Sequence, residues 1–382
     1  MNSKTVLAKV NRICSTFNKK RHRNRAMQRN FLQKMPLAQE DTERSYFQYK
    51  CWAFLLGVGK PFLNNVFAFP LLMRELLLYK MKAKPKCNDD KKKKKNAAFF
   101  PAGNETRIPN ILREEYEEII SVKDVQGTRS GEDFVFIKKY LLRRYPFSFF
   151  FLLKIIYKIK MYRGILEQYS VGAIITTNEY SFTSSVLTLF CNENGIEHIN
   201  VMHGEKSFLI RDAYFRYDRC YVWDQFYVDL FRELRATENN FIIAIPPHLI
   251  LNTRVVAKEV DYTYYLADEG KNELQKIRKC LMDLKNKGMR VAYRPHPIYE
   301  TKCTEKVLEG IERETSEKYD IGLSIMRTNN VISKHSTVMY QAYINGVNVV
   351  VDDVTSPDMY RAFKEASYIM LNKSHALLSG LL

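Results

Sequence analysis

From residue 171 onward, short apolar segments alternate with longer amphipathic stretches, and this alternation constrains the fold more than any other feature of the chain. Residues 171–177 have the continuous apolar character of a buried strand. Residues 181–194 have helical spacing and end at Gly195, and residues 197–202 are expected to form the next strand. Two strands joined through a helix lie parallel in one sheet. The pattern therefore predicts a β-α-β unit.

The alternation continues to residue 351 and is interrupted at the paired prolines Pro246 and Pro247, where we expect a domain boundary. Before the prolines, strands are expected at 219–223 and 241–245, with a helix at 225–235. After them, strands are expected at 262–267, 290–293, 331–332 and 347–351, and helices at 269–287, 301–315 and 337–344. Upstream helices are expected at 110–121, 132–145 and 149–166. The fold class is α/β: two Rossmann-like β/α domains facing a cleft, with a basic helical N-terminal extension.

The net charge of +18 is concentrated near the start of the chain. Residues 1–95 contain 23 Lys and Arg against 6 Asp and Glu, so they carry +17 of the +18. Within them, residues 4–20 place apolar side chains at helical spacing beside basic ones, as an interfacial amphipathic helix requires. We therefore divide the chain into a basic N-terminal segment (1–95), an N-terminal β/α domain (96–246) and a C-terminal β/α domain (247–382).

The basic segment predicts binding to an anionic membrane surface, with a purely solvated face as the alternative. Specific nucleic-acid binding is not expected, because no helix-turn-helix, finger or RNP pattern accompanies the charge. The apolar stretch 52–79 is interrupted by Lys60, Pro70 and Arg74 and is not expected to span a bilayer. The seven scattered cysteines are typical of a reducing compartment. We expect a cytoplasmic protein, peripheral at the inner face of the membrane.

Several motifs of common cofactor and metal enzymes are missing from the sequence. No GxGxxG, GxxxxGK[ST] or HExxH pattern occurs, so dinucleotide oxidoreductases, P-loop NTPases and zincins have no motif support. A DxD-type metal motif is also lacking, because Asp352 and Asp353 follow a strand late in the chain. We therefore expect neither a metal nor a cofactor.

The strand expected at 290–293 is followed directly by Arg294, Pro295, His296 and Pro297. Ligands bind at the carboxyl ends of strands in open α/β sheets. An imidazole held between two prolines beside an arginine can bind a phosphate through charge-assisted hydrogen bonds. A strand-end histidine satisfied by the backbone is the alternative.

Ser336 and Thr337 stand where the helix expected at 337–344 begins, which is a suitable place to bind an anion. N-capping by Ser336 explains the same residue without a ligand. Tyr340 lies one turn further on, within reach of a base or sugar. Asp268, Glu269 and Gly270 form an acidic cluster at an expected helix start, which favours a structural role.

His203 and Glu205 follow the strand expected at 197–202. Either can serve as a general base that takes a proton from a hydroxyl. The histidine has a suitable unperturbed pKa of about 6.5, whereas a carboxylate needs close positioning or a raised pKa. The sequence leaves both candidates open.

These motifs, in this order, resemble those of bacterial GT-B glycosyltransferases of surface-polysaccharide synthesis. The Pro-flanked His296 and the Ser336-Thr337 pair are similar to motifs of bacterial sialyltransferases and polysialyltransferases, which use CMP-sialic acid. The His203-Gly204 and Arg294–Pro297 elements equally resemble those of CDP-glycerol glycerophosphotransferases. The resemblance covers residues 170–352. It implies that His296 contacts the donor phosphate and assists departure of the nucleotide. It also implies that Ser336 and Thr337 bind this phosphate.

The acidic motif that holds the sialyltransferase base has no clear match in the N-terminal domain, and UDP-sugar 2-epimerases share the layout. The function expected is a metal-independent GT-B-like glycosyltransferase. It would move a sugar from a nucleotide donor onto a glycan or lipid-linked acceptor in polysaccharide, capsule or lipooligosaccharide synthesis, and a donor similar to CMP-sialic acid is favoured. The C-terminal domain would bind the nucleotide donor and the N-terminal domain the acceptor. The alternatives are a CDP-polyol phosphotransferase, a UDP-sugar 2-epimerase and a non-catalytic polyanion-binding protein.

Overall fold

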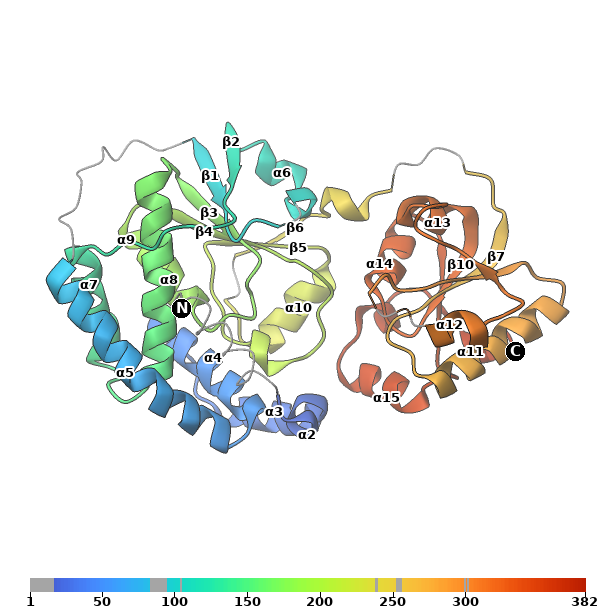
Figure 1. The fold of residues 1–382 in the computed structure, drawn as a ribbon, viewed down its shortest axis with the longest axis horizontal. Helices are drawn as coiled ribbons and strands as arrows, with labels where there is room; N and C mark the ends of the chain where they lie inside the picture. Colours follow the sequence, from blue (N-terminus) through green and yellow to red (C-terminus); the bar gives the residue numbers. More distant parts are fainter. Residues whose placement is uncertain are drawn as a thin grey trace. The chain divides into compact units, whose positions relative to one another are not determined.

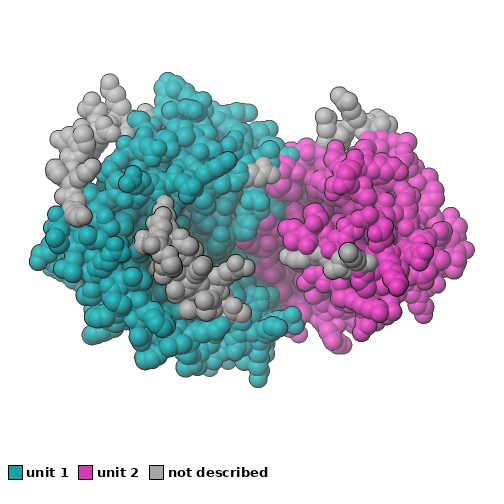
Figure 2. All heavy atoms as spheres, in the orientation of Figure 1, with its two compact units in different colours: residues 1–203, 208–247 teal, residues 204–207, 248–382 magenta. Residues whose placement is uncertain are grey.

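The computed structural model describes residues 17–82, 95–103, 105–237, 240–251, 256–298, 300 and 302–382. The chain forms two compact units (Figures 1 and 2). Unit 1 comprises residues 1–203 and 208–247, and unit 2 comprises residues 204–207 and 248–382. The main boundary between the units lies directly after Pro247, beside the paired prolines that the sequence singles out.

Unit 1 is built on a parallel six-stranded sheet in the order β2-β1-β3-β4-β5-β6. The strands are β1 (Asn96–Phe99), β2 (Glu118–Ser121), β3 (Ala173–Thr176), β4 (Glu197–Val201), β5 (Arg219–Val222) and β6 (Phe241–Ile243). All four residues of β3 are buried, as expected for a parallel strand covered on both faces. This explains why that strand is a continuous apolar run in the sequence.

Helices cover the unit 1 sheet and supply most of its core. They are α2 (Lys19–Arg23), α3 (Arg25–Lys34), α4 (Asp41–Leu56), α5 (Gly59–Lys82), α6 (Asn110–Arg113), α7 (Gly131–Ile137), the π-helical turn η2 (Lys138–Leu142), α8 (Phe149–Gln168), α9 (Ser184–Glu193) and α10 (Gln225–Glu233), with 3₁₀ turns η1 (Glu105–Arg107) and η3 (Ile210–Asp212). Helix α8 is buried along most of its length, and α5 packs along it (Figure 1). The large apolar core of unit 1 lies around α8.

Unit 2 is built on a second parallel six-stranded sheet, in the order β12-β11-β10-β7-β8-β9. Its strands are β7 (Val260–Tyr265), β8 (Val291–Arg294), β9 (Glu312–Arg313), β10 (Thr328–Ser333), β11 (Asn348–Val351) and β12 (Ala376–Leu377). Its helices are α11 (Lys271–Asn286), α12 (Lys302–Val307), α13 (Ile321–Arg327), α14 (Thr337–Ile344) and α15 (Pro357–Glu365), with 3₁₀ turns η4 (Pro247–Leu249), η5 (Ile369–Asn372) and η6 (Leu378–Gly380). The predicted class, two Rossmann-like β/α domains with N-terminal helices, is confirmed.

Three sequence expectations differ from the structure. The helix expected at 110–121 is instead the short α6 followed by β2, and the helix expected at 301–315 ends at Val307 and gives way to β9. Gly310 has φ = +90°, a left-handed conformation that ends the helical path there. The expected helix at 132–145 is divided into α7 and the π-helical turn.

The basic N-terminal segment is not a separate extension where it is described. Helix α4 packs on α9 and η3, and α5 packs on α8, so residues 17–82 belong to unit 1. The amphipathic pattern at 4–20 lies almost entirely outside the described residues. None of the helices in the described ranges combines the length and apolar character of a bilayer span.

Candidate functional site

The carboxyl ends of β3 and β4 bring a glutamate and a histidine together in unit 1. Glu179 lies three residues beyond β3 and His203 two residues beyond β4, and these strands are parallel neighbours. His203 Nδ1 and Glu179 Oε1 are 3.0 Å apart. The Glu179 side chain is fully buried, whereas the His203 side chain retains 34% of its exposure. The buried carboxylate therefore holds a histidine that stays accessible.

Further hydrogen bonds fix Glu179 in place. Its second oxygen, Oε2, accepts from Asn200 Nδ2 at 3.3 Å, and Asn200 Oδ1 accepts from the Asn178 backbone N–H at 2.9 Å. The Glu179 carbonyl accepts from Gln48 Nε2 at 2.9 Å. The edge of the Tyr180 ring meets the His203 ring at 5.6 Å between centroids. These contacts pre-organise the pair before any substrate binds.

This geometry suits general base chemistry. When Nδ1–H of a neutral imidazole donates to a carboxylate, the other nitrogen, Nε2, is unprotonated and can accept a proton. The carboxylate then stabilises the imidazolium that forms. His203 is among the site residues that the sequence predicts, whereas Glu179 is not. The available signal was its position directly after the strand predicted at 171–177.

Glu205, the other candidate base, belongs to unit 2. Burial raises the pKa of Glu205 to about 8, against an opposing hydrogen bond from the Tyr368 hydroxyl. Its Oε1 is buried and has no hydrogen-bond partner among the described residues. At neutral pH this carboxyl is therefore mostly protonated and cannot accept a further proton. His203 is the better supported base.

Tyr368 connects Glu205 to the start of α14. Its hydroxyl also accepts from the Ser336 backbone N–H at 3.5 Å. Ser336 is the N-cap of α14, and its Oγ accepts from the Val338 backbone N–H at 3.3 Å. The structure thus brings two predicted site residues, Glu205 and Ser336, to one place through Tyr368. Thr337 is half-buried in the first turn of α14, whereas Tyr340 is buried.

His296 is half-buried and lies two residues beyond β8. Its Nδ1 accepts from the Ile298 backbone N–H at 3.1 Å, so the neutral ring carries its proton on Nε2. That nitrogen is then a donor suited to a phosphate oxygen. His296 lines a pocket whose other residues are Leu266, Ala267, Glu269, Leu274, Pro295, Glu300 and Thr304.

Arg294 and Pro297 lie close to His296 in sequence but do not line this pocket. Arg294 is 8% exposed, and its guanidinium donates to the Tyr319 carbonyl at 2.9 Å and lies 4.0 Å from Glu314. These contacts satisfy the charge and the buried position of the Arg294 guanidinium without any ligand. Pro297 is exposed.

The acidic cluster at 268–270 has the structural role that the sequence favoured. Gly270 is the N-cap of α11, and Glu269 Oε2 accepts from the Ala267 backbone N–H at 2.6 Å. Lys334, which is 3% exposed, lies 3.3 Å from Glu269 and 3.2 Å from Glu273. The lysine beside the predicted Ser336-Thr337 pair is thus ion-paired inside the fold.

A polar pocket also lies in unit 1. It is lined by Lys158, Tyr162, Asn178, Ser181, Thr183, Ser184, Leu187, His198 and Tyr217. Burial, with a smaller contribution from Lys154, lowers the pKa of Lys158 to about 8. Burial also lowers the pKa of His198 to about 3, so this imidazole stays neutral. Asn178 and Ser181 flank Glu179 in sequence, so this pocket adjoins the loop that carries Glu179.

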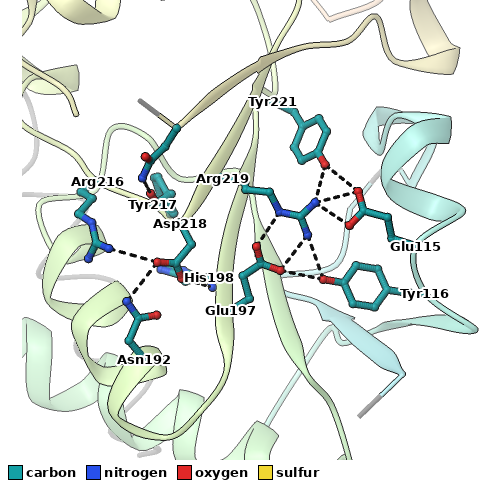
Figure 3. A network of polar contacts seen from close by, with 11 residues as sticks. Glu115, Tyr116, Asn192, Glu197, His198, Arg216, Tyr217, Asp218, Arg219 and Tyr221 are labelled. Atoms are coloured by element: carbon teal, nitrogen blue, oxygen red, sulfur yellow. Dashed lines mark hydrogen bonds and ion pairs between the residues drawn. The ribbon is translucent and has the colours of Figure 1, made fainter. Parts of the chain in front are cut away.

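The opposite, amino-terminal edge of the unit 1 sheet carries a dense polar network (Figure 3). Arg219 at the start of β5 donates to Glu197 at the start of β4 and to Glu115, at distances of 2.6–2.8 Å. Asp218 accepts from Arg216 and Asn192. These charges satisfy one another at the amino-terminal ends of the strands. They stabilise the amino-terminal edge of the sheet. The candidate site lies at the opposite, carboxyl edge.

Comparison of the sequence with protein-family models and with curated proteins gives no match. Solved structures with a similar fold include the wall teichoic acid polymerase TagF, with 13% identity, 82% of this chain and 83% of that chain covered, and a TM-score of 0.38. The UDP co-structure of MnaA from S. aureus has 12% identity, coverage of 71% and 87%, and a TM-score of 0.43. A putative UDP-N-acetylglucosamine 2-epimerase from Listeria monocytogenes has 9% identity, coverage of 70% and 82%, and a TM-score of 0.42.

Proposed function

We propose that the protein is a glycosyltransferase that moves a sugar from a nucleotide donor onto the hydroxyl of a glycan or lipid-linked acceptor. The observation that carries this proposal is the hydrogen bond between the accessible His203 side chain and the fully buried Glu179 side chain. A CMP-sialic acid-like donor is the favoured substrate. The transfer needs no metal, and the enzyme acts at the cytoplasmic face of a membrane, where residues 1–95 attach it.

In the proposed step, unit 1 activates the acceptor and unit 2 holds the donor. His203 Nε2 takes the proton of the acceptor hydroxyl while the oxygen attacks the anomeric carbon of the sugar. The bond between that carbon and the donor phosphate oxygen breaks, and its electron pair leaves with the nucleotide. His296 Nε2–H donates to the departing phosphate, and the α14 amino terminus at Ser336 and Thr337 offers further donors.

Glu205 fits the donor side of this scheme in its protonated form. A neutral carboxyl beside Ser336 does not repel a phosphate, whereas an ionised one would.

The first test is ligand binding to the full chain, measured as a thermal shift with CMP, CDP and UDP, with their sugar conjugates and with CDP-polyols. A ligand at about 100 times its Kd adds about 2.7 kcal/mol to stability. Stabilisation by CMP and CMP-sugars supports the proposed donor. Stabilisation by UDP species alone favours an epimerase, and by CDP-polyols a phosphotransferase. No stabilisation by any nucleotide contradicts a donor site.

The second test is turnover with the donor found in this way. Glu179→Gln keeps the shape of the side chain but removes the charge that stabilises the imidazolium, so turnover should fall by about 10²–10⁴-fold. His296→Ala should also lower turnover, with loss of donor binding. The matched control is Glu118→Gln at an exposed position of β2. A folded Glu179→Gln variant with unchanged turnover would contradict the base assignment.

A further inference from the structure

Helix α5 buries a mainly apolar face against the core of unit 1 and also presents large apolar side chains on its outward face. The buried positions recur at helical spacing as Asn64, Ala68, Leu72, Glu75 and Tyr79. The outward positions are large and apolar: Phe62 (70% exposed), Val66 (51%), Phe67 (59%), Phe69 (46%), Met73 (37%), Leu77 (59%) and Met81 (76%). A surface helix normally turns its apolar stripe inward. Here two of the five buried side chains are polar, and the face away from unit 1 is hydrophobic.

The exposed apolar side chains of the described residues are concentrated on this helix. Eight of the 22 exposed large hydrophobic residues lie on α5, and Val58 directly precedes the helix. Phe147 is 81% exposed and extends the patch, because its carbonyl accepts from Asn65 Nδ2 at 3.4 Å. Single exposed apolar residues are normal, but a contiguous patch marks an interaction site.

The inner face of α5 fixes the rotation of the helix. Glu75, 3% exposed, lies 2.8 Å from Lys160 Nζ on α8 and 2.9 Å from an Arg129 guanidinium nitrogen. Asn65 Oδ1 accepts from the Phe150 backbone N–H at 3.0 Å. Turning the apolar face inward would break these bonds and leave Lys160 and Arg129 without their anion. The outward orientation of the apolar face is therefore fixed by the packing of α5 on unit 1.

The charges around this face select the partner. The acidic residue of α5, Glu75, is buried in its ion pairs, whereas Arg74 and Lys80 are exposed beside the apolar stripe. Residues 17–82 contain 13 Lys and Arg against 4 Asp and Glu. An apolar stripe bordered by cations matches a bilayer surface, where acyl chains lie beneath anionic headgroups. Pro70 and Arg74 interrupt the apolar run of α5, which favours a helix that lies on the surface rather than across it.

We propose that the outward face of α5, with Phe147, docks unit 1 on an anionic lipid bilayer. The helix lies in the plane of the interface, its apolar side chains enter the acyl boundary, and Arg74 and Lys80 contact headgroups. This refines the membrane attachment proposed above, but it needs no transferase activity. It assigns the contact to a folded surface of unit 1 instead of the amphipathic pattern at 4–20.

The test is co-sedimentation of the full chain with phosphatidylcholine vesicles with and without phosphatidylglycerol, without substrate. The variant Phe62→Ser/Phe69→Ser/Leu77→Ser should lose binding at least tenfold. The matched control is Ile111→Ser/Ile243→Ser, which removes exposed apolar side chains elsewhere in unit 1 and should bind like wild type. Arg74→Gln/Lys80→Gln should lose the preference for phosphatidylglycerol.

A second measurement does not depend on the triple variant folding. Phe62→Trp should show a blue-shifted fluorescence change on adding anionic vesicles, and Ile111→Trp should not. Absence of the shift, or wild-type binding of the triple variant, overturns the proposal. So does binding that is lost only on deleting residues 1–16. If the triple variant instead changes the oligomeric mass and leaves vesicle binding intact, a second copy covers the face and the proposal is wrong. Because no substrate is present, failure here is distinguishable from failure of the transferase.

Discussion

Glu205→Gln should make the protein more stable at neutral pH, which is an unusual result for a buried residue. Burial raises the pKa of Glu205 from 4.5 to about 8. Above pH 4.5 the unfolded carboxyl is ionised, whereas the folded one must still bind a proton. Folding therefore becomes less favourable by about 1.4 kcal/mol per pH unit between these two values. The deficit is about 1 kcal/mol at pH 5 and about 3 kcal/mol at pH 7.

Glutamine is neutral at every pH and keeps an oxygen that can accept from the Tyr368 hydroxyl. The stability advantage of Glu205→Gln should therefore grow by about 2–3 kcal/mol from pH 5 to pH 7 and level off above pH 8. Urea unfolding followed by circular dichroism at each pH measures this difference. Glu309→Gln, at an exposed position of unit 2, is the control. A difference that stays constant with pH would show that Glu205 is ionised in the folded protein.

Two further predictions concern buried charges of unit 1. Burial alone would raise the pKa of Glu75, but Lys160 and Arg129 outweigh it and hold the pKa below its usual value. Glu75→Gln leaves both cations buried without an anion and should lower the free energy of unfolding in urea by about 3–5 kcal/mol. This difference from the wild type should shrink as the pH falls, because wild-type Glu75 then becomes protonated. Wild-type stability at pH 7 would contradict the ion pairs. Lys158, with a pKa lowered to about 8, should be acylated by an amine-specific reagent with a pH midpoint near 8. A midpoint equal to that of exposed Lys50 would refute the lowered pKa.

The strand–helix alternation was predictable where strands are buried on both faces. The strands expected at 171–177, 197–202 and 347–351 are confirmed. The first of them is a nearly continuous apolar run because it is covered on both faces. Strands β1 and β2 were missed. Strand β1 contains two alanines and no β-branched residue, and it lies near the basic run that ends at Lys95. Its position at the second place in the sheet is set by pairing with β2 and β3, which no local pattern shows.

The site was only partly predictable, for a related reason. The sequence placed His203 and His296 at the ends of strands, which follows from periodicity alone. Whether Glu205 or Glu179 serves the histidine depends on burial and on contacts between distant segments. Glu205 is two residues from His203 in sequence, yet it packs in unit 2, whereas Glu179 is 24 residues away and forms the bond. Adjacency in sequence was therefore a poor guide to the chemical partner.

The outward face of α5 shows the same limit of local sequence patterns. The stretch 52–79 is apolar enough to attract attention, and its interruptions correctly argued against a span. Hydropathy alone does not say which side of such a helix faces the protein. That choice is made by Asn65 and Glu75, whose polar groups are paired with the Phe150 backbone and with Lys160 and Arg129. A buried ion pair thus leaves the phenylalanines of α5 facing outward, and the residue that looks least suited to a membrane helix determines which face the membrane would meet.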